Sequence, residues 1–164
     1  MQLLISDANI LIDLEEGELV EHMFGLPYLF SIPDILFVEE LEERHEYLIG
    51  LGLRLHELSG AAVMYSMQIV SKYHKTSRND CFALALAAQE KCPLLTGDKP
   101  LRIAAESEAI VVMGTIWLVE QMVKQRLIDT SQARLAFEKM KGCGRRLPWG
   151  VAEAKLKSID ISRV

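Results

Sequence analysis

Short apolar runs recur along the chain, each followed by a segment with helical periodicity, and this alternation restricts the fold more than any other feature. The runs cover residues 3–6, 28–32, 94–96 and 110–113, with a weaker one at 53–58. Continuous apolar runs of this length are typical of parallel strands, which are buried on both faces. Strands that alternate with helices predict an α/β fold with three layers, α/β/α, around a central, mostly parallel sheet.

The rest of the chain is predicted to be helical beyond Gly114, with breaks at residues 142–144 and at Pro148. A helix is also expected after Pro33, with Asp34 as its N-cap. No repeat or low-complexity linker divides the 164 residues, so we expect a single domain over 1–164. Residues 115–164 are expected to form a helical C-terminal extension packed on that domain.

Composition places the protein among globular chains, because half of its residues are apolar and a quarter are charged. No apolar run reaches the roughly 18 residues that a membrane span needs. The N-terminus lacks the basic start and cleavage site of a signal peptide. The three cysteines show no metal-ligand spacing and are interpreted as reduced thiols. We therefore expect a cytoplasmic protein without a membrane partner.

The net charge of −5 argues against a general DNA-coating protein, which would be basic. It does not exclude a nuclease, because bound divalent ions cancel part of an acidic cluster and local basic patches can hold phosphates. Ordinary solvated faces are the simpler interpretation of each basic patch. The candidate patches contain Lys72, His74, Lys75 and Arg78, then Lys99 and Arg102, then Lys141, Arg145 and Arg146.

Four acidic positions stand where a strand stops or a helix begins. They are Asp7, Asp80, Asp98 and one of the neighbours Glu39 and Glu40. Carboxylates at the carboxyl ends of parallel strands can converge in one crevice. Such carboxylates repel one another unless a hard cation such as Mg²⁺ or Mn²⁺ is bound between them. A site of this kind suits phosphodiester hydrolysis.

Each of these acids also has a purely structural interpretation. Asp7 and Asp98 can cap the helices that follow them. Ser77 and Asp80 match the S-x-x-D capping pattern. The Glu39 and Glu40 pair lies in an acid-rich stretch that is typical of a solvated helix face. The capping and catalytic roles are compatible, so both interpretations stay open.

With these segments laid out, the chain resembles the PIN-domain family of metal-dependent ribonucleases, including the VapC-type toxins of toxin–antitoxin pairs. The resemblance covers most of the chain. Four segments carry it, and the Thr-x-Asp of the last is the most specific. They are LLISDANIL at Asp7, IPDILFVEEL at Glu39 and Glu40, NDCFALALA at Asp80, and LLTGDKPLR at Thr96 and Asp98.

The resemblance implies catalytic carboxylates at Asp7, Asp80, Asp98 and the second acidic position. Asp7, Asp98 and Asp80 would bind Mg²⁺ or Mn²⁺. Asn9 and Thr96 would support them through hydrogen bonds. Leu41 follows Glu40 directly, which favours Glu40 at the second position, whereas the spacing from Pro33 favours Glu39.

The function that the resemblance implies is cleavage of single-stranded RNA by metal-activated water. If the toxin analogy holds, an antitoxin protein would block the crevice and the chain would form a homodimer. Two alternatives compete with this prediction. A haloacid-dehalogenase-type phosphatase would need an Asp where Asn9 stands. A PIN-like scaffold that binds protein or RNA without cutting would keep the fold and lose the chemistry.

Overall fold

Five parallel strands form the centre of the molecule, in the order β3-β2-β1-β4-β5. The computed structural model describes residues 1–163. Within them the strands are β1 Gln2–Ser6, β2 Tyr28–Pro33, β3 Arg54–His56, β4 Leu94–Leu95 and β5 Val112–Met113. Helices flank this sheet, so the predicted three-layer α/β/α fold is confirmed.

The strand order changes direction next to β1, which pairs with β2 on one side and with β4 on the other. A crevice opens at the carboxyl ends of the strands at such a topological switch point. Ser6 of β1 stands opposite Leu95 of β4 in the register. The backbone N–H of Asp7 donates to the carbonyl of Leu95 at 3.0 Å. The residues that follow the two strands, Asp7 and Thr96, are therefore placed side by side at the switch point.

Eleven helices are present in the described residues, and five of them begin with a capping side chain. Asp7, Ser59, Ser77, Asp98 and Asp129 each accept a backbone N–H of the helix that follows. The first eight helices are α1 Ala8–Glu16, α2 Val20–Met23, α3 Asp34–Glu40, α4 Glu42–His45, α5 Tyr47–Leu51, α6 Gly60–Lys72, α7 Arg78–Glu90 and α8 Lys99–Ser107. The last three are α9 Thr115–Lys124, α10 Thr130–Gly142 and α11 Trp149–Ser162.

Helix α7 is the most deeply buried helix and lies directly against β1, β2 and β4. Seven consecutive residues, 81–87, are buried, and four of them are alanine or cysteine. Small side chains let the helix approach the sheet closely while α6 covers its outer side. The start of α7 is thereby fixed near the carboxyl ends of the strands, which brings Asp80 towards the crevice.

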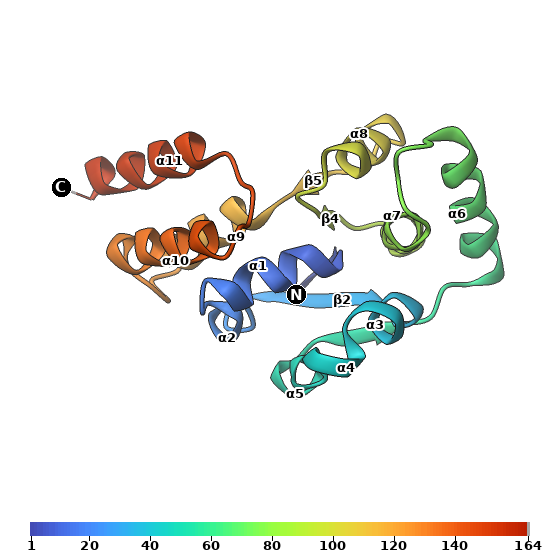
Figure 1. Ribbon diagram of the computed structural model, residues 1–164, viewed down its shortest axis with the longest axis horizontal. Coiled ribbons are helices and arrows are strands. Elements are labelled where there is room, and N and C mark those ends of the chain that lie inside the picture. The colour runs from blue at the N-terminus through green and yellow to red at the C-terminus, as the bar shows by residue number, and fades with distance from the viewer. Residues whose placement is uncertain (164) are drawn as a thin grey trace.

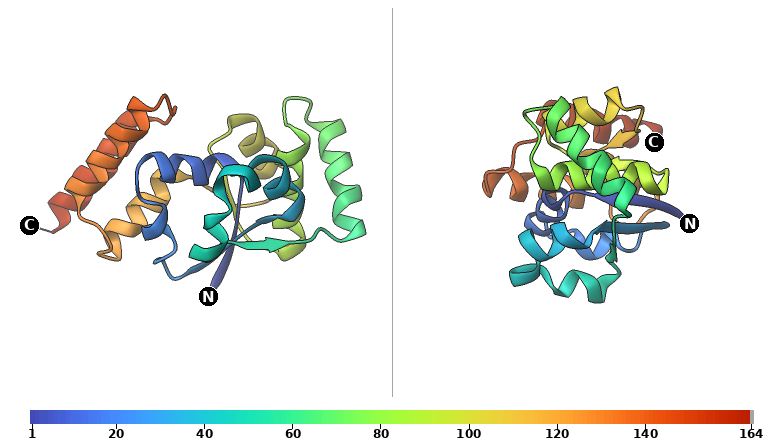
Figure 2. Two further views of the ribbon diagram at one scale, coloured as in Figure 1. Left: turned by 60° about the horizontal axis from the view of Figure 1, so that its bottom comes forward. Right: turned by 90° about the vertical axis from the view of Figure 1, so that its right-hand side faces the viewer.

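The three C-terminal helices extend the molecule at the end opposite α6, where α10 and α11 lie side by side (Figures 1 and 2). Helices α9 and α10 both contact α1. At Gly17, which ends α1, a Cβ would come 2.6 Å from the Met140 side chain and 3.3 Å from the Ala136 carbonyl oxygen, so this close approach favours glycine. The division of the chain at residue 115 stays a prediction.

Three local expectations need correction. Pro33, and not Asp34, is the N-cap of α3, because Asp34 is already helical and its carboxylate accepts the N–H of Ile35. The helix expected through this region is broken at Leu41 and at Glu46 into α3, α4 and α5. Another break, at residues 125–129, separates α9 from α10 and was not predicted. No helix within residues 1–163 is long and apolar enough to cross a membrane.

Candidate functional site

Asp7 is the most unusual side chain of the site, because it is a carboxylate that is only 1% exposed. Its Oδ1 accepts the backbone N–H of Ile10 at 3.0 Å, so it caps α1. Its Oδ2 accepts the hydroxyl of Thr96 at 2.5 Å. Burial raises the pKa of Asp7 from its ordinary 3.8 to about 7, and the charge of Asp80 adds to that rise against the two hydrogen bonds.

Thr96 connects the ends of β1 and β4. Its hydroxyl donates to Asp7 and accepts the backbone N–H of Asp98 at 3.0 Å. The carboxylate of Asp98 accepts the N–H of Leu101 at 2.9 Å and so caps α8. The Thr-x-Asp segment thus orients two acids with one hydroxyl. The capping interpretation of both acids is correct, and it leaves the second oxygen of Asp98 without a protein hydrogen bond among the described residues.

Asp80 lies in the first turn of α7, with its N–H donating to the hydroxyl of Ser77 at 3.1 Å. Partial burial raises its pKa, and the charges of Asp98 and Glu40 raise it further, while hydrogen bonds with Ser77 lower it. The charges of Asp98 and Glu40 act on Asp80, and the charge of Asp80 acts on Asp7, so the four predicted acids lie within electrostatic range along one edge of the sheet.

The two neighbouring glutamates at the end of α3, Glu39 and Glu40, have side chains with different partners. Glu39 forms an ion pair with Arg78 at 2.6 Å. Hydrogen bonds with Asn79 and Arg78 lower the pKa of Glu39. Glu40 has no ion pair among the described residues and contributes to the acidic field at Asp80. The placement of the two side chains thus favours Glu40 as the fourth acid.

A buried acid that was not predicted, Asp13, lies one helical turn beyond Asn9 on α1 and faces the same side. Its Oδ2 accepts the hydroxyl of Thr115 at 2.8 Å, and its Oδ1 accepts Nε of Arg145 at 2.5 Å. The Oδ1 of Asn9 accepts a second guanidinium nitrogen at 3.1 Å. Asn9 therefore contacts Arg145, and no hydrogen bond joins it to Asp7 within residues 1–163. The signals in the sequence were the spacing of four residues between Asn9 and Asp13 and the position of Asp13 within an apolar helix face.

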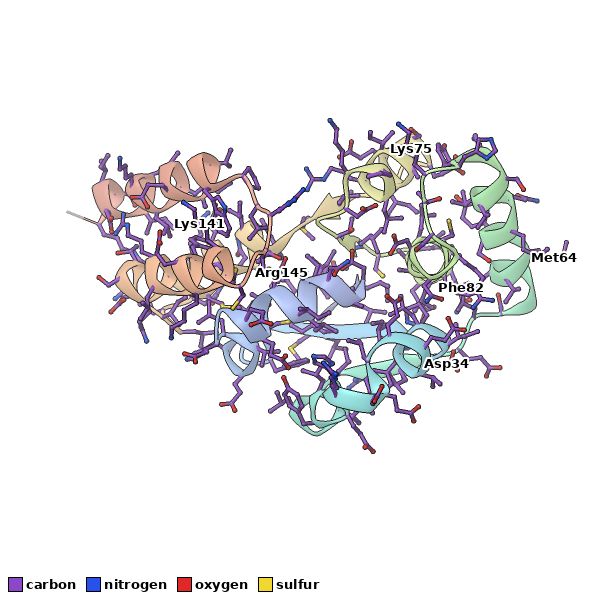
Figure 3. All side chains as sticks on the ribbon, viewed as in Figure 1. Asp34, Met64, Lys75, Phe82, Lys141 and Arg145 are labelled. Carbon is purple, nitrogen blue, oxygen red and sulfur yellow. The ribbon has the colours of Figure 1, made fainter. Side chains whose placement is uncertain are left out.

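A cavity of about 290 Å³ opens beside Asp13 and Asp98. One side is formed by the starts of α1 and α8, and the other by the connection between α10 and α11. Its lining residues are Asn9, Asp13, Gly97, Asp98, Gly144, Arg145, Arg146 and Leu147. In Figure 3, Arg145 extends from that connection over α1.

The donor set suits a hard divalent cation, because it offers only carboxylate oxygens whose charges raise one another's pKa. Within residues 1–163, no three His, Cys, Asp or Glu side chains are close enough to form a ready-made metal cage. Mg²⁺ does not require one, because it keeps several waters and commonly binds through one or two carboxylates together with substrate phosphates. The residues therefore fit such an ion.

A parallel α/β sheet with carboxylates at its switch point is typical of proteins that bind a divalent cation there. Comparison with known families shows which family the chain belongs to. A family model described as PIN domain matches residues 3–160. The chain belongs to the PIN-domain family, as its acidic motifs predicted. Proteins of this family are generally nucleases and typically use divalent metal ions.

Two solved structures are similar to the chain at low sequence identity. A PilT N-terminus domain protein from the hyperthermophilic archaeon Sulfolobus solfataricus P2 is 13% identical with a TM-score of 0.50, covering 75% of this chain and 94% of that one. The VapBC2 structure from Rickettsia felis, bound to a DNA fragment from its promoter, is 12% identical with a TM-score of 0.49, covering 69% and 98%. No curated protein matches the sequence. The first likeness supports the fold alone.

Proposed function

We propose that the protein is a metal-dependent endoribonuclease that cleaves single-stranded RNA. One observation carries the proposal: Thr96 joins the acids that follow two adjacent strands, Asp7 and Asp98, at the switch point of the sheet. The raised pKa of Asp80, to which the charges of Asp98 and Glu40 contribute, supports the inclusion of Asp80 and Glu40 in the same site. Ordinary helix capping does not account for a fully buried carboxylate whose pKa is raised to about 7.

Each residue has a separate task in this proposal. Asp7 and Asp98 bind Mg²⁺ or Mn²⁺, and Asp80 completes the set of ligands or holds their waters. Glu40 is the fourth acid, and Glu39 is assigned to the ion pair with Arg78. Thr96 orients Asp7 and favours its ionised form by donating its hydroxyl hydrogen. When bound, the cation would supply a water of lowered pKa and stabilise the charge that develops on the phosphate.

The buried position of Asp7 suits this chemistry. Burial removes the water that would stabilise the negative charge of a carboxylate. A bound cation provides that stabilisation instead, so a buried carboxylate has a strong affinity for a cation. Without the cation, part of the Asp7 population is protonated near neutral pH. The pKa rise therefore supports a cation-binding role and makes that binding pH-dependent.

The biological setting is proposed from the resemblance of the sequence motifs to VapC-type toxins. In that setting the protein is a cytoplasmic toxin, forms a homodimer and is blocked by an antitoxin protein. The alternative function is a scaffold that binds RNA or protein without cutting. The presence of all four acids favours the enzyme over the scaffold.

The test is cleavage of a mixed panel of single-stranded RNAs with Mn²⁺, Mg²⁺ or EDTA. Asp7→Asn and Asp98→Asn are the active-site variants, and Asp129→Asn is the matched control because Asp129 caps α10 as Asp98 caps α8. We expect metal-dependent cleavage that both active-site variants lose and the control keeps. A wild-type protein that does not bind metal and does not cut any RNA would leave the scaffold as the correct function.

A further inference from the structure

The connection between α10 and α11, residues 143–148, forms the second wall of the cavity at the acidic site. It places two adjacent arginines there, Arg145 and Arg146. Gly144 begins the turn with a φ of 83°, in the left-handed region that favours glycine. The wall is therefore built from a part of the chain more than 40 residues beyond the last of the four acids, Asp98.

Arg145 fixes this connection in place. Its guanidinium donates to Asp13, which is 5% exposed, and to Asn9. Asp13 is held in turn by Thr115 at the start of α9. A charge-assisted pair with a buried carboxylate gives a firm anchor. Its charge is neutralised by Asp13, so Arg145 is an anchor of the loop and not a free cation.

Arg146 differs from its neighbour, because its side chain is exposed and forms no ion pair or hydrogen bond with any residue from 1 to 163. It lines the same cavity as Asp98 and Gly97. A Cβ built on Gly97 or Gly144 would meet no atom within 4 Å, so both glycines leave the cavity open. An unpaired guanidinium across an open cavity from a metal-binding acid presents a planar set of donors to an anion, and phosphate matches that geometry.

We propose that residues 143–148 form a substrate-binding arm, in which Arg146 contacts a backbone phosphate of the RNA strand next to the phosphate at the acidic site. The proposal rests on the proposed function for the position of the strand. It explains how a chain of net charge −5 holds a polyanion beside a cluster of acidic residues. It also assigns the C-terminal extension a role in the active site.

The test measures binding of a fluorescein-labelled single-stranded oligoribonucleotide by anisotropy at several salt concentrations, in Ca²⁺ buffer with a gel to show that the RNA stays intact. Arg146→Ala removes the cation, and Arg146→Lys keeps the charge without the planar fork. Lys157→Ala is the matched control, because Lys157 is an exposed cation of the same extension, on α11, that does not line the cavity and lies outside the basic patch of Lys141, Arg145 and Arg146. The melting temperature of each variant is recorded, and exposed Arg146 should not change it.

We expect Arg146→Ala to weaken RNA binding about ten-fold. The slope of the logarithm of the binding constant against the logarithm of the salt concentration should become shallower by about 0.7, as the loss of one phosphate contact to a single strand predicts. The affinity of Arg146→Lys should lie between those of the wild type and Arg146→Ala, and Lys157→Ala should bind as the wild type does. Equal binding by Arg146→Ala and Lys157→Ala would overturn the arm, and so would a wild type that binds no RNA. Cleavage with Mn²⁺ is measured separately. If Arg146→Ala loses RNA binding while the wild type binds RNA but does not cut it, the substrate-binding arm is supported and the nuclease function is refuted.

Discussion

The buried carboxylate of Asp7 makes the stability of the metal-free protein depend on pH, and Asp7→Asn should remove that dependence. The pKa of Asp7 is 3.8 in an unfolded chain and about 7 in the folded protein. Between these two values the unfolded chain ionises Asp7 while the folded one keeps its proton, so stability falls as pH rises. Above pH 7 the loss is complete, and a shift of this size corresponds to about 4 kcal/mol.

Asn is neutral and of the same shape, so the variant avoids this cost. It retains an acceptor for the N–H of Ile10 but loses the hydrogen bond from Thr96, which costs about 1 kcal/mol. At pH 8 in EDTA, Asp7→Asn should therefore be about 3 kcal/mol more stable than the wild type. For a chain of this length, that is a rise in melting temperature of roughly 6–12 °C. Near pH 4 the advantage should vanish.

The assay is urea unfolding followed by circular dichroism from pH 4 to pH 9 in EDTA, with Asp129→Asn as the control. Mg²⁺ or Mn²⁺ is then added. The cation should stabilise the wild type, by about 2.7 kcal/mol at a concentration of 100 times its Kd, and leave Asp7→Asn unchanged. A variant that is less stable than the wild type at pH 8 in EDTA would refute the reasoning, because the charge of Asp7 would then be stabilised by the protein alone.

Three further changes test other parts of the structure. Thr96→Val should lower the cleavage rate roughly 10–100-fold, because Asp7 loses the hydroxyl that orients it, whereas Thr96→Ser should keep most of the rate. Arg145→Ala should lower the free energy of unfolding by about 2–4 kcal/mol in urea titrations, because Asp13 is left as an unpaired buried charge. Glu108 accepts hydrogen bonds from Tyr65, Tyr73 and Lys72, and those partners lower its pKa to about 2. A lowered pKa stabilises the fold above about pH 4.5 and ceases to do so as pH falls towards 2, so the destabilisation by Glu108→Gln at pH 7 should disappear in acid unfolding curves.

The positions of three acids could be predicted from the sequence because each depends on a local signal. Asp7 directly follows an apolar run, Asp98 follows another after Gly97, and Asp80 lies three residues after a capping serine. Short buried strands in a parallel sheet end at one edge, so the neighbourhood of these acids follows from the fold class. The capping roles of Asp7 and Asp98 did not compete with the site, since one carboxylate oxygen of each caps a helix while the other remains for different partners.

The choice between Glu39 and Glu40 could not be made in this way. The two glutamates are adjacent on a short helix that ends at Leu41, and a helical period does not decide between neighbours at a helix end. What separates them is tertiary: Arg78, 39 residues further along the chain, takes Glu39 as its ion-pair partner. No local pattern contains that information.

The Asp13–Arg145 pair was missed for the same reason, because 132 residues separate its members. An acid within an apolar helix face is a sign of a buried partner, but the sequence does not say which cation supplies it. Arg145 and Arg146 were both recognised as members of a basic patch. Only the structure distinguishes the anchoring arginine from the free one.

The most direct measurement is the single-turnover rate of RNA cleavage at saturating Mn²⁺ for Asp98→Asn and Asp129→Asn. Both changes replace an N-cap aspartate by asparagine, which is an equally good cap, so helix stability is matched. Only Asp98 stands at the acidic site. We predict that Asp98→Asn loses at least about two orders of magnitude in rate while Asp129→Asn equals the wild type. Equal rates for the two variants would contradict the assignment of the switch-point acids as the metal-binding site.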